Sequence, residues 1–188
     1  MGLTTRARRI AAAATTTVAA AGLAIGISTL AQAAPGSRAG TAVPVTACDS
    51  HVVLVWMNIP GNGAAGTIFY RLHFTNLSGR ACTLDGFPFI HAVNLAGLPI
   101  GNRAVFKRRL GAPHTVTVGR GKTVNATLAI TEASNFPRTK CKPVTAAGLE
   151  VFAPTGINEV GRIVPIPFGA CTTVGRLAPF FMRVGAVH

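Results

Sequence analysis

The residues that could do chemistry are few in this chain, and the four cysteines are the most informative of them. Cys48, Cys82, Cys141 and Cys171 all follow an N-terminal stretch that has the features of an export signal. Structural zinc sites use cysteines at C-x2-C type spacing, and no such pair occurs here. An even cysteine count behind an export signal predicts two disulfides in an oxidising compartment. Four cysteines allow three connectivities, and the sequential one would join Cys48 to Cys82 and Cys141 to Cys171.

A hydrolytic site would need an activated nucleophile or a pair of carboxylates. Beyond the leader no serine lies in a G-x-S-x-G elbow. Asp49 and Asp85 are the carboxylates that a Cys48–Cys82 bond could bring together. However, Asp85 precedes Gly86 in a turn, where an aspartate normally caps the local backbone. The sequence therefore favours a protein without enzymatic activity and without a cofactor.

Histidines and aromatic residues offer little more. His51 and His73 could be neighbours across a sheet, but no H-x-H or H-x3-H spacing supports a metal site. Sugar and single-strand nucleic-acid binders stack ligands on exposed aromatic rings. Trp56 and Tyr70 lie instead in segments with a core-like pattern, and we expect Trp56 to pack against a disulfide. No metal and no aromatic platform are predicted.

The N-terminus has the order of regions found in a secretory leader. Arg6, Arg8 and Arg9 precede the uncharged run 10–30, and Ala31-Gln32-Ala33 is an A-x-A cleavage site. We therefore predict a helical signal peptide over 1–33. The rival interpretation is an uncleaved membrane anchor, but a run of mainly Ala, Gly and Thr is a poor permanent anchor. Secretion or retention in the cell envelope is the expected location.

The rest of the chain is expected to be a spacer, 34–46, followed by one domain over 47–188. Removal of the leader would take away three of the 18 basic residues and none of the 5 acids, which leaves a formal net charge of +10. Such a domain is drawn to anionic surfaces, which outside the cell are envelope polymers, lipid head groups or acidic proteins rather than nucleic acid. The candidate binding residues are Lys107, Arg109, Arg138, Lys140 and Lys142. Alternatively, the charge only reflects a basic exported proteome or protects a sheet edge from aggregation.

Strand patterns dominate this domain. Apolar and polar residues alternate along Thr67–Thr75 and Lys122–Thr131, and the apolar run His51–Ile59 is expected to be buried on both faces. The residues expected to face the core are Ile68, Tyr70, Leu72, Phe74, Val124, Ala126, Leu128 and Ile130. Weaker strands are expected at Phe89–Asn94, Val105–Arg109, Thr115–Val118, Leu149–Phe152, Arg162–Ile166 and Phe180–Val187. Many short strands separated by turns predict an all-β, antiparallel sandwich.

A family resemblance adds to this prediction. Thr75-Asn76 followed by Cys82-Thr83-Leu84-Asp85-Gly86-Phe87-Pro88 resembles the T-N…C-x-L-x-G-[YF]-P signature of secreted actinobacterial proteins catalogued as domain of unknown function 4232. The resemblance continues over 96–101, 118–124, 141–143, 148–154 and at Cys171. Arg120 replaces the usual proline of one turn, and Val124 replaces a small residue. The resemblance implies an immunoglobulin-like sandwich with two disulfides and an export signal, and it implies no activity and no catalytic residue.

Three hypotheses for function remain open. The first is an exported, non-enzymatic interaction module that engages an anionic polymer, lipid or acidic partner through the basic residues named above. The second is a secreted hydrolase or enzyme inhibitor that uses loops at one end of the sandwich. The third is a structural or accessory domain without a ligand. The sequence predicts no particular oligomeric state.

Overall fold

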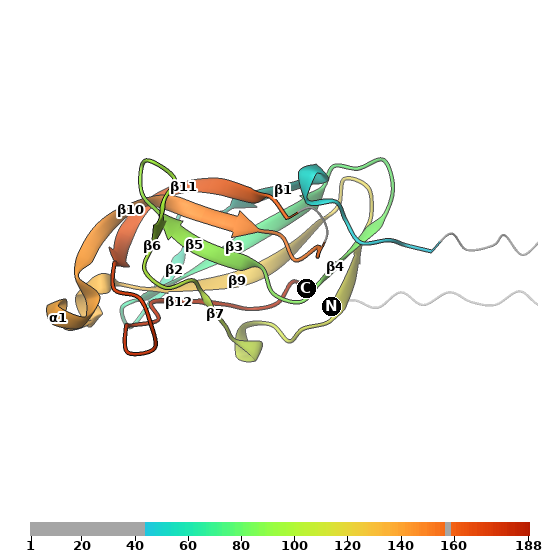
Figure 1. The fold of residues 1–188 in the computed structure, drawn as a ribbon. Coiled ribbons are helices and arrows are strands. Elements are labelled where there is room, and N and C mark those ends of the chain that lie inside the picture. Colours follow the sequence, from blue (N-terminus) through green and yellow to red (C-terminus); the bar gives the residue numbers. More distant parts are fainter. Residues whose placement is uncertain (1–43, 157–158) are drawn as a thin grey trace, which may run out of the picture. The chain divides into compact units, whose positions relative to one another are not determined.

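A computed structural model describes residues 44–156 and 159–188, and these form an antiparallel immunoglobulin-like β-sandwich (Figure 1). The predicted signal peptide and all but the last residues of the predicted spacer lie outside the described residues. In the part of the chain that is described, no helix is long and apolar enough to cross a membrane.

The first layer is a six-stranded sheet. Its strands, in spatial order, are β1 (Val53–Met57), β3 (Thr67–Asn76), β9 (Thr123–Thr131), β12 (Met182–Val184) and β7 (Val105–Phe106), with β2 (Asn62–Ala64) paired to β3. All pairs are antiparallel except β12 with β7. Leu72 and Phe74 of β3 and Ala126 and Leu128 of β9 are fully buried, so the predicted core faces of these two strands are confirmed.

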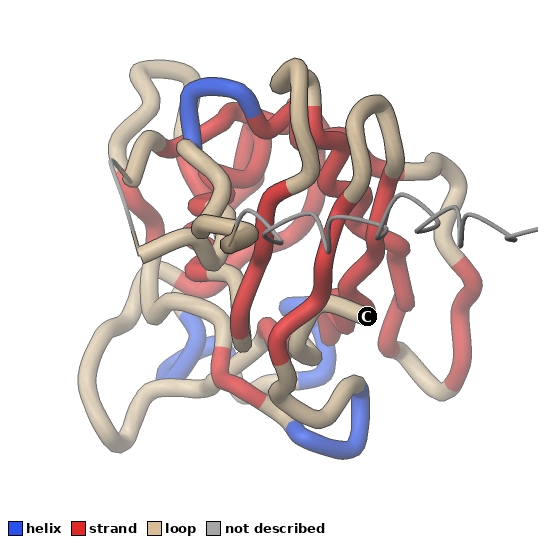
Figure 2. Tube along the Cα trace, turned by 90° about the vertical axis from the view of Figure 1, so that its right-hand side faces the viewer, coloured by secondary structure: helices blue, strands red, loops and turns tan. Residues whose placement is uncertain are grey.

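The second layer is a four-stranded sheet, and a short two-stranded sheet lies beside the layers. The four strands are β11 (Gly161–Cys171), β10 (Pro143–Phe152), β5 (Phe89–Val93) and β6 (Pro99–Ile100), and the pair is β4 (Cys82–Asp85) with β8 (Thr115–Val118). Helical turns are confined to the connections: η1 (Ser50–Val52), η2 (Arg108–Leu110), η3 (Ala133–Asn135) and α1 (Arg138–Cys141). Figure 2 shows how short these turns are beside the strands.

The two inner faces form one apolar core. Its largest fully buried side chains include Phe74, Leu84, Ile90, Leu128, Leu149, Phe181 and Met182. Fully burying a side chain of this size contributes about 1.5–3 kcal/mol each. Burial of alternate residues on long strands is thus what makes the sandwich the stable arrangement of this chain.

The expectation for the first apolar run was wrong. β1 is an edge strand with an alternating pattern, in which Val53 and Val55 are buried while Leu54 and Trp56 are exposed. An edge strand in this position buries only one face, because no second sheet covers the other. Trp56 does not pack against a disulfide; its ring stacks on that of His73, with centroids 3.8 Å apart.

Several predicted strand boundaries also differ. The segment predicted as a strand over Val105–Arg109 is extended only at Val105–Phe106 and then turns into η2. Lys107 and Arg109 therefore do not share a strand face. β10 and β11 are longer than expected, since Pro143 already pairs with Cys171 and Gly148 with Pro165.

The two disulfides brace opposite ends of the sandwich. Cys48–Cys82 joins the segment before β1 to the start of β4, beside the end of β3. Cys141–Cys171 joins the end of α1 to the end of β11. The structure thus has the sequential pairing, and no described cysteine is free. We call these two regions the Cys48 end and the Cys141 end.

Candidate functional site

At the Cys141 end, a short helix and a loop are bound to each other. The loop, residues 172–179, follows β11 directly after the disulfide. The backbone N–H of Thr172 donates to the carbonyl of Cys141 at 3.0 Å, and its hydroxyl donates to the carbonyl of Lys142 at 3.0 Å. The start of the loop is therefore held against the end of α1 by the disulfide and by hydrogen bonds from Thr172.

The middle of the loop is tied to a second element. Asn102 stands just after β6, and its side-chain carbonyl accepts from the N–H of Gly175 at 3.0 Å. Its amide nitrogen donates back to the carbonyl of Gly175, also at 3.0 Å. The hydroxyl of Thr173 donates to the carbonyl of Lys140. Because the loop is tied on both sides, its exposed side chains are presented by a defined backbone.

Apolar side chains project from this tied loop. Val174 is 72% exposed and Leu177 is 95% exposed. Between the loop and α1 lies a shallow hollow of about 350 Å³, lined by Lys140, Thr173, Val174, Leu177 and Ala178. A cation of the helix and aliphatic side chains of the loop thus border the same hollow. We call α1, Lys142 and residues 172–179 together the α1 surface.

The charge of the α1 surface has one sign. Arg138, Lys140 and Lys142 are all exposed, and Arg176 adds a fourth exposed cation from the loop. The sequence has no acidic residue over 133–149 or after Glu159. None of these four cations therefore has an acidic neighbour within its own segment.

The structure divides the predicted basic residues into two groups. Arg138, Lys140 and Lys142 lie together at the α1 surface. Lys107 and Arg109 are exposed at η2, the yellow-green turn after β7, well away from α1 in Figure 1. Arg176 and the two aliphatic residues of the loop were missed by sequence reasoning. One feature of the sequence could have indicated these loop residues. The loop follows directly after Cys171, and a disulfide from Cys171 to Cys141 places it beside Lys140.

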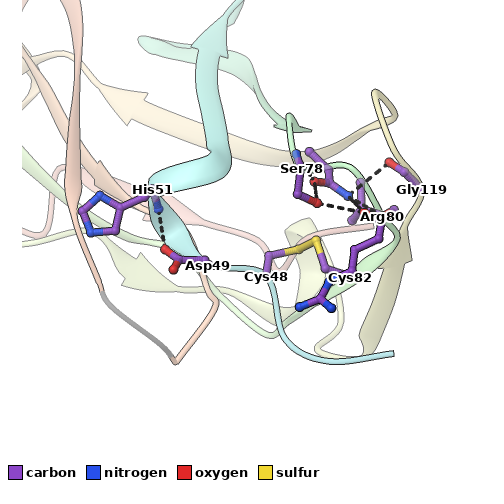
Figure 3. Close-up of a disulfide and its surroundings, with 9 residues drawn as sticks. Cys48, Asp49, His51, Ser78, Arg80, Cys82 and Gly119 are labelled. Atoms are coloured by element: carbon purple, nitrogen blue, oxygen red, sulfur yellow. Dashed lines mark hydrogen bonds between the residues drawn. A yellow bond between two sulfur atoms is a disulfide. The ribbon is translucent and has the colours of Figure 1, made fainter. Parts of the chain in front are cut away.

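The carboxylates proposed for an alternative hydrolytic site have local roles at the Cys48 end. Asp49 precedes η1 and its Oδ1 accepts from the N–H of His51 at 2.9 Å (Figure 3). Asp85 accepts from the hydroxyl of Thr115 on the neighbouring strand at 3.1 Å. Over 44–156 and 159–188, no group of three or more His, Cys, Asp or Glu side chains is placed to hold a metal ion.

His51 and His73 are not cross-strand neighbours, as His51 lies in η1. The partners of His73 in the sheet are Trp56 on β1 and Asn125 on β9. Burial lowers the pKa of His73, and the positive charge of Arg71 lowers it further, while the neighbouring side chain of Asn125 acts in the opposite direction. Burial therefore favours the neutral form of His73 beneath the Trp56 ring.

Comparison with known protein families adds the decisive observation. The family model described as "Domain of unknown function (DUF4232)" matches residues 48–174, which include both disulfides and the start of the loop. The chain belongs to the DUF4232 family. The resemblance noted in the sequence is confirmed. No curated protein matches the chain.

The DUF4232 signature residues explain the Cys48 end. Asn76, which is 1% exposed, donates from Nδ2 to the carbonyls of Arg80 at 2.8 Å and Val118 at 2.9 Å. Its Oδ1 accepts from the N–H and the hydroxyl of Ser78 at 2.8 and 2.6 Å. These bonds close the loop that leads to Cys82 (Figure 3). The asparagine of the signature is thus a structural residue that satisfies buried backbone groups.

Proposed function

We propose that this DUF4232 domain is an exported, non-enzymatic interaction module that binds an anionic surface of the cell envelope through the α1 surface. The observation that supports this proposal is the group of four exposed cations on a helix and loop that a disulfide fixes together. Two disulfides suggest an oxidising, extracellular compartment, where anionic envelope components are the available partners.

The physical reason is the one-sided charge. Four cations whose own segments contain no acidic residue create a positive potential, which raises the rate of encounter with an anionic partner. The partner meets a surface that is already ordered, so little conformational entropy is lost on binding. Binding of this kind weakens as salt screens the exposed charges, with a Debye length of about 8 Å at physiological ionic strength.

The first prediction concerns retention by the envelope. The purified domain should sediment with an envelope fraction of the producing cell, and it should be released as salt rises from about 0.05 to about 0.5 M. The triple variant R138E/K140E/K142E should lose most of this binding. Two matched controls are R120E/K122E, at a turn of the Cys48 end, and K107E/R109E at η2; both should bind within about twofold of the unaltered protein.

Two results would contradict the proposal. One is release that does not depend on salt. The other is a triple variant that is folded, as shown by an unchanged thermal midpoint, and still binds like the unaltered protein. Loss of binding in K107E/R109E instead of the triple variant would move the contact from the α1 surface to η2.

A further inference from the structure

We infer that the anionic partner is a phospholipid bilayer, into which Val174 and Leu177 insert while Arg138, Lys140, Lys142 and Arg176 contact lipid head groups. This inference rests on the proposed function, because it assigns a partner to the same surface. It adds a role for the two aliphatic side chains, which attraction between charges does not explain.

Exposure of the aliphatic side chains is the first argument. Single exposed apolar residues are common, and Leu95 at the turn between β5 and β6 is as exposed as Leu177. Leu98 in the same turn is 61% exposed, so a close pair of exposed leucines is not particular to the loop. The loop differs because Val174 and Leu177 border one hollow with Lys140, whereas residues 94–101 contain no cation. A soluble polyanion or an acidic patch would pair with the cations and leave Val174 and Leu177 in water. A bilayer offers phosphates and hydrocarbon at adjacent depths, so it fits both kinds of side chain.

The arrangement of the cations is the second argument. Arg138 and Lys140 come from α1, Lys142 follows it, and Arg176 stands between Val174 and Leu177 in the loop. Lysine and arginine have long aliphatic stems, which lets the charge stay at the head groups while the neighbouring apolar atoms go deeper. Stable attachment to a membrane usually needs two such signals, an apolar insertion and a basic group. The α1 surface has both.

The ties of the loop are the third argument. The loop is joined to α1 by Cys141–Cys171 and to Asn102 by two hydrogen bonds. A loop that is ordered before binding does not have to be ordered on the membrane, so the gain from burying Val174 and Leu177 is retained as affinity. The apolar tip is therefore suited to shallow insertion rather than to folding upon binding.

The test compares vesicles with a soluble polyanion. One probe is vesicles of phosphatidylcholine containing about one third phosphatidylglycerol, a second is vesicles of phosphatidylcholine alone, and the third is long-chain polyphosphate. The charge variant R138E/K140E/K142E should lose more than about 100-fold in binding to anionic vesicles, at about fivefold for each charge neutralised, and it should also lose polyphosphate binding. V174S/L177S should lose about tenfold per residue on the vesicles and bind polyphosphate unchanged.

Leu77→Ser is the matched control, since Leu77 is a strongly exposed leucine in the loop after β3 at the Cys48 end. Its binding to all three probes should equal that of the unaltered protein. Each variant must also keep the thermal midpoint of the unaltered protein, which shows that the fold is intact. The depth of insertion of residue 177 is measured independently with Leu177→Trp in a Trp56→Phe background. Anionic vesicles should shift the emission of this indole to the blue.

The outcomes separate the two proposals. If V174S/L177S binds anionic vesicles as well as the unaltered protein, or if Leu177→Trp shows no blue shift, the bilayer inference is wrong while the charge proposal stands. The partner would then be an anionic polymer or an acidic protein. If R138E/K140E/K142E still binds both anionic probes, the proposed function itself fails. Equal binding to vesicles without phosphatidylglycerol would also overturn the inference, since the cations would then have no role.

Discussion

The two ends of the sandwich are each braced by a disulfide, yet they use their side chains in opposite ways. At the Cys48 end polar groups turn inward: Asn76 makes hydrogen bonds within its loop, and Arg162 donates from β11 to a carbonyl of η1 at 2.9 Å. At the Cys141 end Asn102 and backbone groups hold the loop, while Val174 and Leu177 face solvent. Polar side chains of the Cys48 end thus make internal hydrogen bonds, whereas the loop of the Cys141 end exposes two aliphatic side chains.

This difference separates what the family resemblance explains from what it does not. The signature asparagine and the cysteine at Cys82 both belong to the internal contacts of the Cys48 end. Such residues specify a fold, because replacing them leaves buried groups without partners. Family membership therefore predicts the sandwich. The proposed contact lies instead at the Cys141 end, where exposed residues contribute little to folding.

The largest effect that tests this comparison comes from removing one disulfide at a time. By the chain-entropy model, each bond closes a loop of roughly 30 residues and contributes about 4 kcal/mol. Both C48A/C82A and C141A/C171A should therefore lose several kcal/mol of unfolding free energy, out of about 5–15 kcal/mol for a typical domain. Urea unfolding followed by circular dichroism measures the loss.

The two disulfide variants should differ in binding. C141A/C171A releases the loop from α1, so it should also lose binding to anionic vesicles under conditions where it remains folded. C48A/C82A should keep that binding at temperatures below its own midpoint. Equal binding by the two folded variants would show that the covalent tie between α1 and the loop has no role in the contact.

A smaller effect comes from the two asparagines that tie the loops. Asn76→Ala removes bonds to buried carbonyls and should cost about 3 kcal/mol, since an unsatisfied buried group costs about 1–3 kcal/mol. Asn102→Ala removes exposed bonds to Gly175 and should cost less than about 1 kcal/mol. Asn102→Ala should nevertheless increase hydrogen exchange at Gly175 and weaken vesicle binding. A destabilisation by Asn102→Ala as large as that by Asn76→Ala would contradict the contrast between the two ends.

Sequence reasoning was accurate where a local pattern determines the structure. Alternation along β3 and β9 gave the correct core faces, because the pleat of a strand sends successive side chains to opposite sides. Sequence reasoning was wrong about the environment of Trp56. The position of β1 at a sheet edge depends on which strands neighbour it, and a single apolar run does not contain that information. For the same reason, the sequence did not show that β7 ends before Lys107.

The candidate site shows the limit more clearly. Arg138, Lys140 and Lys142 were proposed from charge alone, and charge alone did not predict that the structure separates them from Lys107 and Arg109. The residues of the loop were missed altogether, because the loop reaches α1 only through a bond between cysteines 30 positions apart. A contact over that distance is a property of the tertiary structure.

The smallest effect is a response to pH that should come from the ring pair of Trp56 and His73 and not from the α1 surface. Burial holds the pKa of His73 below the ordinary value of 6.5. The unfolded chain therefore takes up this proton before the folded one does, and folding stability falls as the pH drops from about 6.5 through the lowered pKa. His73→Phe keeps a ring beneath Trp56 and removes the titration, so its stability should fall less over this range. His114→Phe, at an exposed histidine, is the matched control and should retain the slope of the unaltered protein.

Trp56 allows this proton to be observed directly. It is the only tryptophan of the chain, and a protonated imidazole in contact with an indole quenches its fluorescence. Emission from the folded domain should therefore fall at a midpoint below pH 6.5, and the transition should vanish in His73→Phe. The α1 surface contains only arginines and lysines as charged groups and has no histidine and no carboxylate side chain. Binding to phosphatidylglycerol vesicles should thus stay constant while the Trp56 signal changes, and a parallel loss of both would show that the ring pair is coupled to the α1 surface.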